Sequence, residues 1–356
     1  MDNSAQGLEG QILKLEEKIR SVQLPLELLE KVNGMITLLR ATLKSGTASY
    51  TNFESVSSYI HWVTSLPFKN ETKDILDLSK AKQILDKNHY GLESVKSRIL
   101  EYLSSIILGM KNNTSDGVIR APILCLIGLV GTGKTTLAYS IAEALGRKFE
   151  RIPFGGMGDA RSLRGQSRAH SDAEPGAIIK KIIDASTKNP VILLDELDRV
   201  TEEARADIMG VLVELLDPEQ NRNFSDHYID FPFDLSHVLF VATGNNTTNI
   251  STAVLDRLEV VQMPSYTDDE KTAISKSYLF PKVRKQSGLA ENQLAINDDV
   301  WPFIIRPLGF DAGIRSLERT IEGVCRKVAK MIVDGKVPQG SFIHITSENY
   351  KQFLPT

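Results

Sequence analysis

Residues 128–135 read Gly-Leu-Val-Gly-Thr-Gly-Lys-Thr and directly follow an apolar run, Ile-Leu-Cys-Leu-Ile, at 123–127. A glycine, four residues and then Gly-Lys-Thr, placed between a buried strand and a helix, is the pattern of a phosphate-binding loop. Such glycines let the backbone turn its N–H groups around a phosphate, and the following helix adds the positive end of its dipole. The sequence therefore predicts a nucleotide site made of Gly128, Gly131, Thr132, Gly133, Lys134, Thr135 and Thr136.

Two side chains of this loop supply the predicted chemistry. We expect the Lys134 ammonium to reach the β- and γ-phosphates of ATP, or the β-phosphate of ADP, and the Thr135 hydroxyl to hold Mg²⁺. A glycine-rich turn before a helix can be purely structural. The Lys-Thr pair and the apolar strand in front of the loop favour nucleotide binding instead.

The composition is that of a globular protein: 356 residues, of which 42% are hydrophobic and 24% charged. Lysine and arginine number 42 against 45 acidic residues, and no basic run reaches five, so we expect no obligatory nucleic-acid partner. The longest mainly apolar stretch, 121–130, is too short to span a bilayer, and the N-terminus lacks signal-peptide features. These observations predict a cytoplasmic or organelle-matrix protein that is not secreted, with Cys125 and Cys325 as core residues.

Between residues 121 and 263, strand-like runs alternate with helical ones, which predicts an α/β fold with a parallel sheet between helices. The expected strands are 123–127, 149–152, 191–194, 238–243 and 260–263. The expected helices between them are 134–145, 175–186, 201–216 and a short one near residue 253.

Helical spacing dominates both ends of the chain. It covers 8–44 with a break at Pro25, a short helix around 59–63, and 76–108 with a break at 88–91. Further helices are expected at 268–279, 298–305 and 311–333, before a short strand at 342–346. We therefore expect a helical arm, a nucleotide-binding domain and a small helical lid, at 1–68, 69–264 and 265–356.

Two carboxylates follow the predicted strand at 191–194. Asp195 at the strand end is expected to lie beside Mg²⁺, and Glu196 to act as general base on a water in line with the γ-phosphate. Acidic residues at this place can also simply cap the next helix. The phosphate loop 60 residues earlier favours the catalytic interpretation.

Three other polar residues are candidates for the same chemistry. Asn245 follows another apolar strand and is placed to orient the attacking water, although asparagine after glycine is usually a turn residue. Arg257 lies between a short predicted helix and the last predicted strand, and Arg315 lies at the start of a predicted helix. A guanidinium suits the charge of a phosphoryl transition state. Either arginine can equally form an ordinary surface ion pair.

Several motifs together closely resemble the AAA+ module of Lon proteases, a P-loop NTPase fold. Besides the phosphate loop, they are Leu-Leu-Asp-Glu-Leu-Asp at 193–198, Glu-Leu-Leu-Asp-Pro-Glu-Gln-Asn at 214–221, Phe-Ser-Asp-His-Tyr at 224–228, Ala-Thr-Gly-Asn at 242–245, Leu-Asp-Arg-Leu-Glu-Val at 255–260 and Ala-Gly-Ile-Arg-Ser-Leu-Glu-Arg at 312–319. The similarity extends back through 86–92 and 60–67, and so covers nearly the whole chain from about residue 10.

The resemblance implies a role for each candidate residue. Asp195 and Glu196 match Walker B, Asn245 matches sensor 1, Arg315 matches sensor 2, and Arg257 matches the arginine finger given to a neighbouring subunit. The segment His89, Tyr90 and Gly91 resembles the part that lies against the adenine. In this family the module forms a hexameric ring that unfolds proteins and threads them to a serine peptidase domain.

Three features depart from the family pattern. The phosphate loop has Leu129-Val130 where Lon usually has two prolines, and we expect binding to survive because these side chains do not touch phosphate in the family. The serine–lysine peptidase domain is expected about where the chain stops, and its nucleophile motif does not appear in the sequence, so no peptidase activity is expected from this chain alone. In the pore loop, residues 166–174, His170-Ser171 replaces an aromatic–aliphatic pair that grips substrate.

The sequence thus predicts an ATP-hydrolysing AAA+ module that unfolds and translocates proteins in a self-associated ring. The altered pore loop favours an alternative, an assembly or scaffold ATPase that is switched by nucleotide and does not translocate substrate. A DNA remodeller of the same superfamily fits the phosphate loop but not the Lon-specific motifs or the weak basic clustering.

Overall fold

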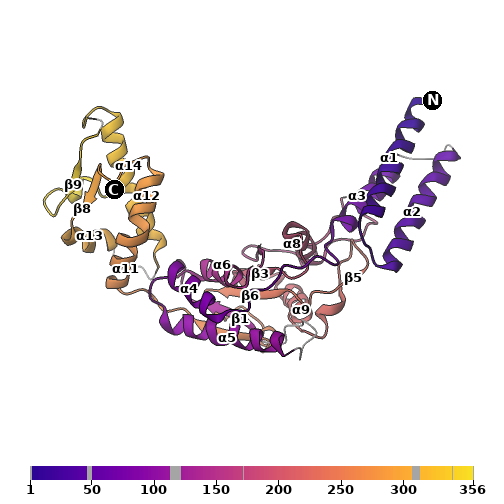
Figure 1. The fold of residues 1–356 in the computed structure, drawn as a ribbon, viewed down its shortest axis with the longest axis horizontal. Helices are drawn as coiled ribbons and strands as arrows, with labels where there is room; N and C mark the ends of the chain where they lie inside the picture. The colour runs from indigo at the N-terminus through magenta and orange to yellow at the C-terminus, as the bar shows by residue number, and fades with distance from the viewer. Residues whose placement is uncertain are drawn as a thin grey trace.

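A computed structural model describes residues 2–45, 50–112, 122–170, 172–306, 313–338 and 340–355. The molecule is an arch with an α/β unit in the middle, the N-terminal helices at one end and the C-terminal helices at the other (Figure 1). In the part of the chain that the structure describes, no helix is long and apolar enough to cross a membrane.

The N-terminal arm consists of α1 (Asp2–Ser21), α2 (Leu26–Lys44) and α3 (Tyr50–Ser65). Pro25 separates the first two helices, as predicted, because proline has no backbone N–H to continue α1 yet is compatible with the start of α2. The apolar residues of α2 recur every three or four positions and are buried on one face: Leu28, Val32, Ile36 and Leu39. Helix α3 begins earlier than the predicted 59–63 segment, and residues 46–49 lie outside the described part.

The central sheet confirms the predicted α/β fold. Within the described residues five parallel strands have the order β2-β3-β6-β1-β7. Their bounds are β1 (Ile123–Ile127), β2 (Phe149–Pro153), β3 (Val191–Asp195), β6 (Leu239–Gly244) and β7 (Leu258–Gln262). Because all strands are parallel, their carboxyl ends share one edge of the sheet, and the loops that follow β1, β3 and β6 meet there.

Alternate residues of each strand face opposite sides of the sheet. Leu124 and Leu126 of β1 belong to the core shared with α4 (Leu78–Asn88), α5 (Glu93–Lys111) and α6 (Lys134–Leu145). Cys125 and Ile127 belong to the opposite core, shared with α8 (Ala177–Ala185) and α9 (Arg205–Leu215). Both cysteines are free and buried, as expected of core residues.

The last sheet strand and several short elements differ from the prediction. β7 begins at Leu258 rather than 260, because an edge strand tolerates the charged Glu259, which pairs with Arg98 at 3.1 Å. The prediction missed α7 (Arg161–Arg164), the 3₁₀ turns η1 (Leu197–Arg199) and η2 (Asn221–Asn223), and the β4 (Phe224–Ser225) and β5 (Pro232–Phe233) ladder. Such short elements leave too few residues for a periodic pattern. The short helix near residue 253 is present as α10 (Thr252–Leu255).

The C-terminal helices begin with a Thr267 capping box at α11 (Asp268–Ile274). The predicted helix 268–279 continues to residue 286, through a wide π turn, η3 (Ser275–Leu279), into α12 (Phe280–Gln286). The wider turn accommodates Pro281, which has no N–H for the regular ladder.

The remaining lid elements are η4 (Asp298–Val300), α13 (Trp301–Ile305), α14 (Arg315–Val333) and η5 (Tyr350–Gln352). The predicted start of α14 at residues 311–312 lies outside the described part. The predicted C-terminal strand is β9 (Ile343–Ile345), and its parallel partner β8 (Leu294–Ile296) was not predicted. These helices pack into one core that confirms the predicted helical lid.

Candidate nucleotide-binding site

A cavity of about 440 Å³ opens at the carboxyl edge of the sheet. It combines backbone from the phosphate loop with side chains from three strand ends and the start of α14. Its lining residues are Val130, Gly131, Gly133, Lys134, Thr135, Thr136, Arg151, Asp195, Glu196, Asn245, Ile314, Arg315 and Glu318. Of the residues predicted from sequence, the phosphate loop, both carboxylates, Asn245 and Arg315 therefore come together, whereas Gly128, Thr132, His89, Tyr90, Gly91 and Arg257 do not line the cavity.

The phosphate loop requires glycine for two different reasons. Gly131 and Gly133 have φ angles of +84° and +93°, which side chains disfavour. At Gly128 the reason is close packing, because an added Cβ would lie 2.6 Å from the Met263 Cβ. Thr132 is fully buried and its hydroxyl donates to the Leu129 carbonyl at 2.8 Å, so its side chain stabilises the loop from behind.

The Lys134 side chain lies across the loop. Its ammonium donates to the Gly128 carbonyl, to the Leu129 carbonyl at 3.0 Å and to Asn245 Oδ1 at 3.2 Å. Burial lowers the pKa of Lys134 below its ordinary value. All three acceptors are neutral oxygens, and a phosphate oxygen, which carries charge, forms a stronger bond with an ammonium.

Thr243 on β6 bonds both strand-end acidic residues, one through its carboxylate and the other through its backbone. Its hydroxyl donates to Asp195 Oδ1 and accepts a bond from the Glu196 backbone N–H at 3.1 Å. Glu196 adopts a left-handed conformation with φ of +61°, which turns its side chain out of the strand direction toward the cavity. Gly155 makes room for it, because a Cβ there would lie 2.6 Å from Glu196 Oε2. The sequence prediction missed Thr243, although its position beside Gly244 and Asn245 at the strand end was a usable signal.

A buried carboxylate orients Asn245. Asp198 accepts the Asn245 backbone N–H at 3.0 Å, and its second oxygen accepts the side-chain amide at 3.4 Å. The amide oxygen is thereby turned toward Lys134. Asn245 is thus held between Asp198 and Lys134 of the phosphate loop.

Arg151 is a cavity residue that the sequence prediction missed. Its Nε donates to Asp195 Oδ2 at 2.6 Å, and its side chain is half exposed whereas the Asp195 side chain is only 6% exposed. Pro153 of β2 pairs with Asp195 of β3, so Arg151 and Asp195 lie on the same face of the sheet. Only the strand pairing reveals this neighbour, because the two residues are far apart in sequence.

The residues present fit a magnesium ion. The Thr135 hydroxyl and the Asp195 carboxylate line one cavity, and both are hard oxygen donors. Mg²⁺ in nucleotide sites takes only one or two protein oxygens and completes its shell with phosphates and water. The Asp195 oxygens accept from Thr243 and Arg151, so an ion held by Asp195 would share its carboxylate with these two donors.

The start of α14 contacts the phosphate loop through the backbone. The Ile314 N–H donates to the Gly131 carbonyl at 3.1 Å, and an added Cβ on Gly313 would lie 2.3 Å from the Val130 carbonyl oxygen. This contact brings Arg315 into the wall of the cavity, next to the loop that would hold the phosphates.

Comparison with known proteins finds two family models and many similar proteins. The model of the ATPase family associated with various cellular activities (AAA) matches residues 124–266, and the model of the Lon protease AAA+ ATPase lid domain matches 285–340. Lon proteases of Lawsonia intracellularis and of Clostridioides difficile are each 44% identical to the chain, over 97% and 89% of its length. The chain belongs to the Lon protease family. It spans about two fifths of the length of these relatives, 40% and 39%.

In this Lon-family chain, the segment at residues 89–91 lies between the phosphate-loop helix and the lid. His89 is buried, and its Nε2 lies 2.9 Å from the Ser140 hydroxyl on α6. Burial lowers the pKa of His89 to about 4, so the ring is neutral at pH 7. An added Cβ on Gly91 would lie 2.8 Å from Glu270 Oε1 on α11, whereas Tyr90 is exposed.

Arg257 of this Lon-family AAA+ module lies outside the cavity of its own chain. Its guanidinium donates to the Ala253 carbonyl at 2.8 Å and pairs with Asp217 at 3.2 Å. The Asp217 carboxylate accepts hydrogen bonds from the Glu219 backbone N–H and from the Arg257 guanidinium, and these bonds lower the pKa of Asp217. Arg257 therefore does not contact the cavity of its own chain.

The pore loop of the Lon pattern connects α7 and α8. His170 is exposed there, and Ser171 lies outside the described residues. In the described part of the loop, the His170 N–H donates to the Ser167 carbonyl at 3.1 Å, and the Ala173 N–H donates to the His170 carbonyl at 3.3 Å.

Proposed function

We propose that this AAA+ module of the Lon family hydrolyses ATP at the cavity beside the phosphate loop. The observation that carries the proposal is the arrangement around Thr243, which holds Asp195 and Glu196 at the rim of a cavity lined by Lys134 and Thr135. A nucleotide-binding loop and a fixed carboxylate base are the two parts that hydrolysis requires.

Each residue has a distinct part in the proposed reaction. The Glu196 carboxylate takes a proton from the water that attacks the γ-phosphate, and Asn245 orients that water. Lys134 and Arg315 donate to the phosphate oxygens, where negative charge is spread in the transition state. Mg²⁺, held by Thr135 and Asp195, would neutralise charge on the β- and γ-phosphates. His89, Tyr90 and Gly91, a segment that contacts α6 through His89 and approaches α11 at Gly91, are proposed to lie against the adenine.

We further propose that the active form is a ring, with six subunits as in the family, in which Arg257 acts on the neighbouring site. The ion pair with Asp217 supports this, because it holds the guanidinium outside its own cavity. A contact from one face of a subunit to a different face of the next closes a ring or winds a helix.

The arginine assignment predicts complementation between two inactive variants. Arg257→Ala retains its own base, and Glu196→Gln retains the arginine, so mixed assemblies should recover ATPase activity that neither variant has alone. Activity per wild-type subunit should also rise with protein concentration as subunits assemble. Both are measured by phosphate release, with Arg326→Ala, which removes an exposed arginine, as the charge-matched control. Full-rate hydrolysis by demonstrably monomeric protein would rule out an arginine supplied by a neighbour.

For the cellular role we propose unfolding and translocation of protein substrates toward a serine peptidase domain, because the curated relatives are named Lon protease and are longer than this chain. The proposed division of labour is an arm at 1–68, the ATPase at 69–264 and the lid at 265–356. The alternative, a nucleotide-switched assembly ATPase, is favoured by one observation: the exposed His170 offers no large apolar surface to an unfolded chain.

Substrate stimulation distinguishes these two roles. Burying one large apolar side chain is worth about 1.5–3 kcal/mol, so a loop without such a side chain holds a chain weakly. We expect casein to stimulate the ATPase only slightly, and the double replacement His170→Tyr with Ser171→Val to gain stimulation. A tightly folded protein added at the same concentration is the control. Strong stimulation of the unaltered chain that is insensitive to this loop would place the grip elsewhere.

A further inference from the structure

Both ends of the pore loop are fixed to one short segment, residues 226–230. The Gly176 N–H donates to Asp226 Oδ2 at 2.7 Å, and the His227 N–H donates to the Arg164 carbonyl at 2.7 Å. The two ends also touch each other, because a Cβ on Gly176 would lie 2.0 Å from the Leu163 carbonyl oxygen. The two ends of the loop, at Arg164 and Gly176, are therefore held close together and are both bonded to segment 226–230.

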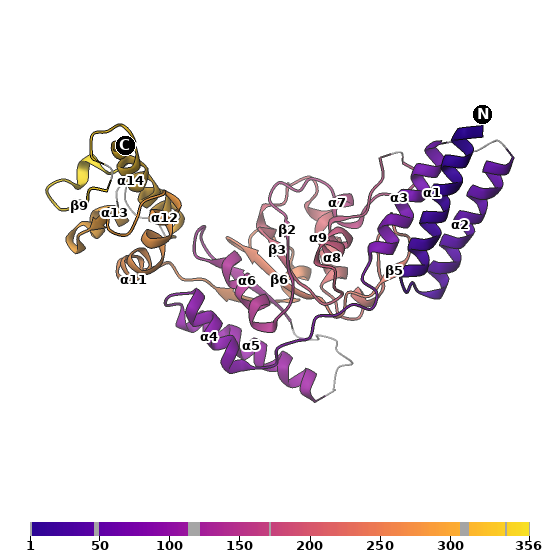
Figure 2. The same cartoon turned by 45° about the horizontal axis from the view of Figure 1, so that its top comes forward.

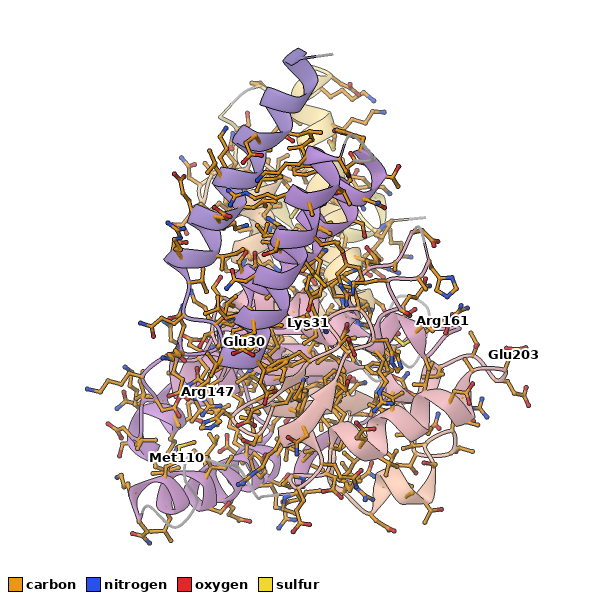
Figure 3. All side chains as sticks on the ribbon, turned by 90° about the vertical axis from the view of Figure 1, so that its right-hand side faces the viewer. Glu30, Lys31, Met110, Arg147, Arg161 and Glu203 are labelled. Atoms are coloured by element: carbon orange, nitrogen blue, oxygen red, sulfur yellow. The ribbon has the colours of Figure 1, made fainter. Side chains whose placement is uncertain are left out.

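The N-terminal arm holds the same segment from the other side. The Tyr59 hydroxyl of α3 donates to the Ile229 carbonyl at 2.9 Å, and Lys31 of α2 donates to the Asp230 carbonyl at 2.8 Å and to its carboxylate at 2.7 Å. Figure 3 shows Lys31 at the end of α2 that meets the α/β unit. Tyr59 is fully buried, and burial raises its pKa to about 12, so the hydroxyl keeps its proton and remains a donor.

Arg168 connects the loop itself to the arm. Its guanidinium carbon lies 4.1 Å from the centroid of the Tyr59 ring, which is stacking distance for a cation–π contact. The same group lies 3.8 Å from Asp230 Oδ2 and 3.9 Å from Met35 Sδ of α2. Figure 2 shows the stretch between α7 and α8 reaching α3.

Within the loop, the described backbone bonds are 3.1–3.3 Å long. Gln166 N–H donates to the Glu174 carbonyl at 3.3 Å, and His170, two residues from Arg168, is exposed. Through its side chain, Arg168 contacts Tyr59 and Met35 of the arm and Asp230 of segment 226–230.

We propose that the N-terminal arm sets the position of the pore loop, and that Arg168 is the positioning residue that transmits it. The arm and the loop then move as one body: a pull on the arm displaces the loop, and a load on the loop is carried to α2 and α3. The functional part of this inference rests on the proposed role of the loop in handling protein substrates. The mechanical part, the dependence of loop order on Arg168, does not.

Hydrogen–deuterium exchange on the whole chain tests the mechanical part. Arg168→Ala should raise amide exchange in residues 166–174 by about tenfold, the order expected for loss of a desolvated cation–π contact with its ion pair. Arg168→Lys keeps the positive charge but loses the planar stacking, so its amide exchange in residues 166–174 should lie between that of the unaltered chain and that of Arg168→Ala. The matched control is Arg161→Ala, whose exposed guanidinium pairs only locally with Asp159 and lies away from the arm (Figure 3).

Amide exchange outside the loop distinguishes a residue that positions the loop from one that stabilises the whole fold. The proposal requires unchanged exchange in the sheet strands and unchanged affinity for ADP in Arg168→Ala. Unaltered loop exchange would overturn it, and so would an increase spread over the sheet and the arm, because that result marks a merely stabilising contact.

The functional part is tested in the His170→Tyr, Ser171→Val background, where casein stimulation is expected. Adding Arg168→Ala should abolish that stimulation while basal ATP hydrolysis stays the same, and retained stimulation would overturn the coupling. If casein stimulates neither the unaltered chain nor the background variant, the proposed translocation fails, and loop exchange alone then decides whether Arg168 positions the loop.

Discussion

Replacing Glu196 with glutamine is expected to slow ATP hydrolysis by about 10²–10⁴, the range typical of a lost general base, while ATP still binds. The substitution keeps the size and hydrogen-bonding shape of the side chain, and the Thr243 bond to the backbone N–H at residue 196 remains. Single-turnover phosphate release measures the effect, and titration with a fluorescent nucleotide measures binding.

Glu203→Gln is the matched control for this variant. Glu203 is exposed in the turn before α9 and does not line the cavity, so its replacement should leave turnover unchanged. If Glu196→Gln hydrolyses ATP at the wild-type rate, the base is another group, and the arrangement around Thr243 has only a structural role.

Lys134→Ala is expected to weaken ATP binding by at least about 10²-fold, since bonds to charged groups are worth about 1.5–3 kcal/mol each and the ammonium would serve two phosphates. The fold should survive, because the partners of Lys134 are loop carbonyls and Asn245, which water can reach once the chain is shortened. Isothermal calorimetry measures the affinity and circular dichroism checks the fold.

Lys87→Ala, which removes an exposed lysine from α4, controls for the change in net charge. Undiminished nucleotide affinity in Lys134→Ala would contradict the assignment of residues 128–136 as the phosphate-binding loop. The two experiments are complementary, because one separates hydrolysis from binding and the other removes binding itself.

The parts of the fold and site that sequence could predict are those encoded in short, regular spacing. The phosphate loop, Asp195 and Asn245 each follow an apolar run, and the parallel sheet brings such strand ends to one edge whatever the strand order. The cavity that gathers the loop, Walker B and Arg315 agrees with that expectation. The roles assigned to these residues stay predictions until the variants above are measured.

What sequence could not supply depends on contacts between distant residues. Arg151 is a site residue only because β2 pairs with β3, and β8 is a strand only because β9 lies beside it. Likewise Arg168 and Tyr59 meet through the packing of the arm on the α/β unit. Such pairings have no local periodicity, and their free energy appears only when the chain has folded.

The hydrogen bond from the Ile314 N–H to the Gly131 carbonyl joins the start of α14 in the lid directly to the phosphate loop. Helix α14 has 19 residues and is therefore about 28 Å long. A tilt of about 5° at its first turn would move the far end of the helix by roughly 2 Å, because the displacement grows with the length of the helix. A small rotation of the Gly131 carbonyl on phosphate binding would therefore give a larger displacement at the far end of α14. That end lies farther from the nucleotide cavity than a side chain can reach.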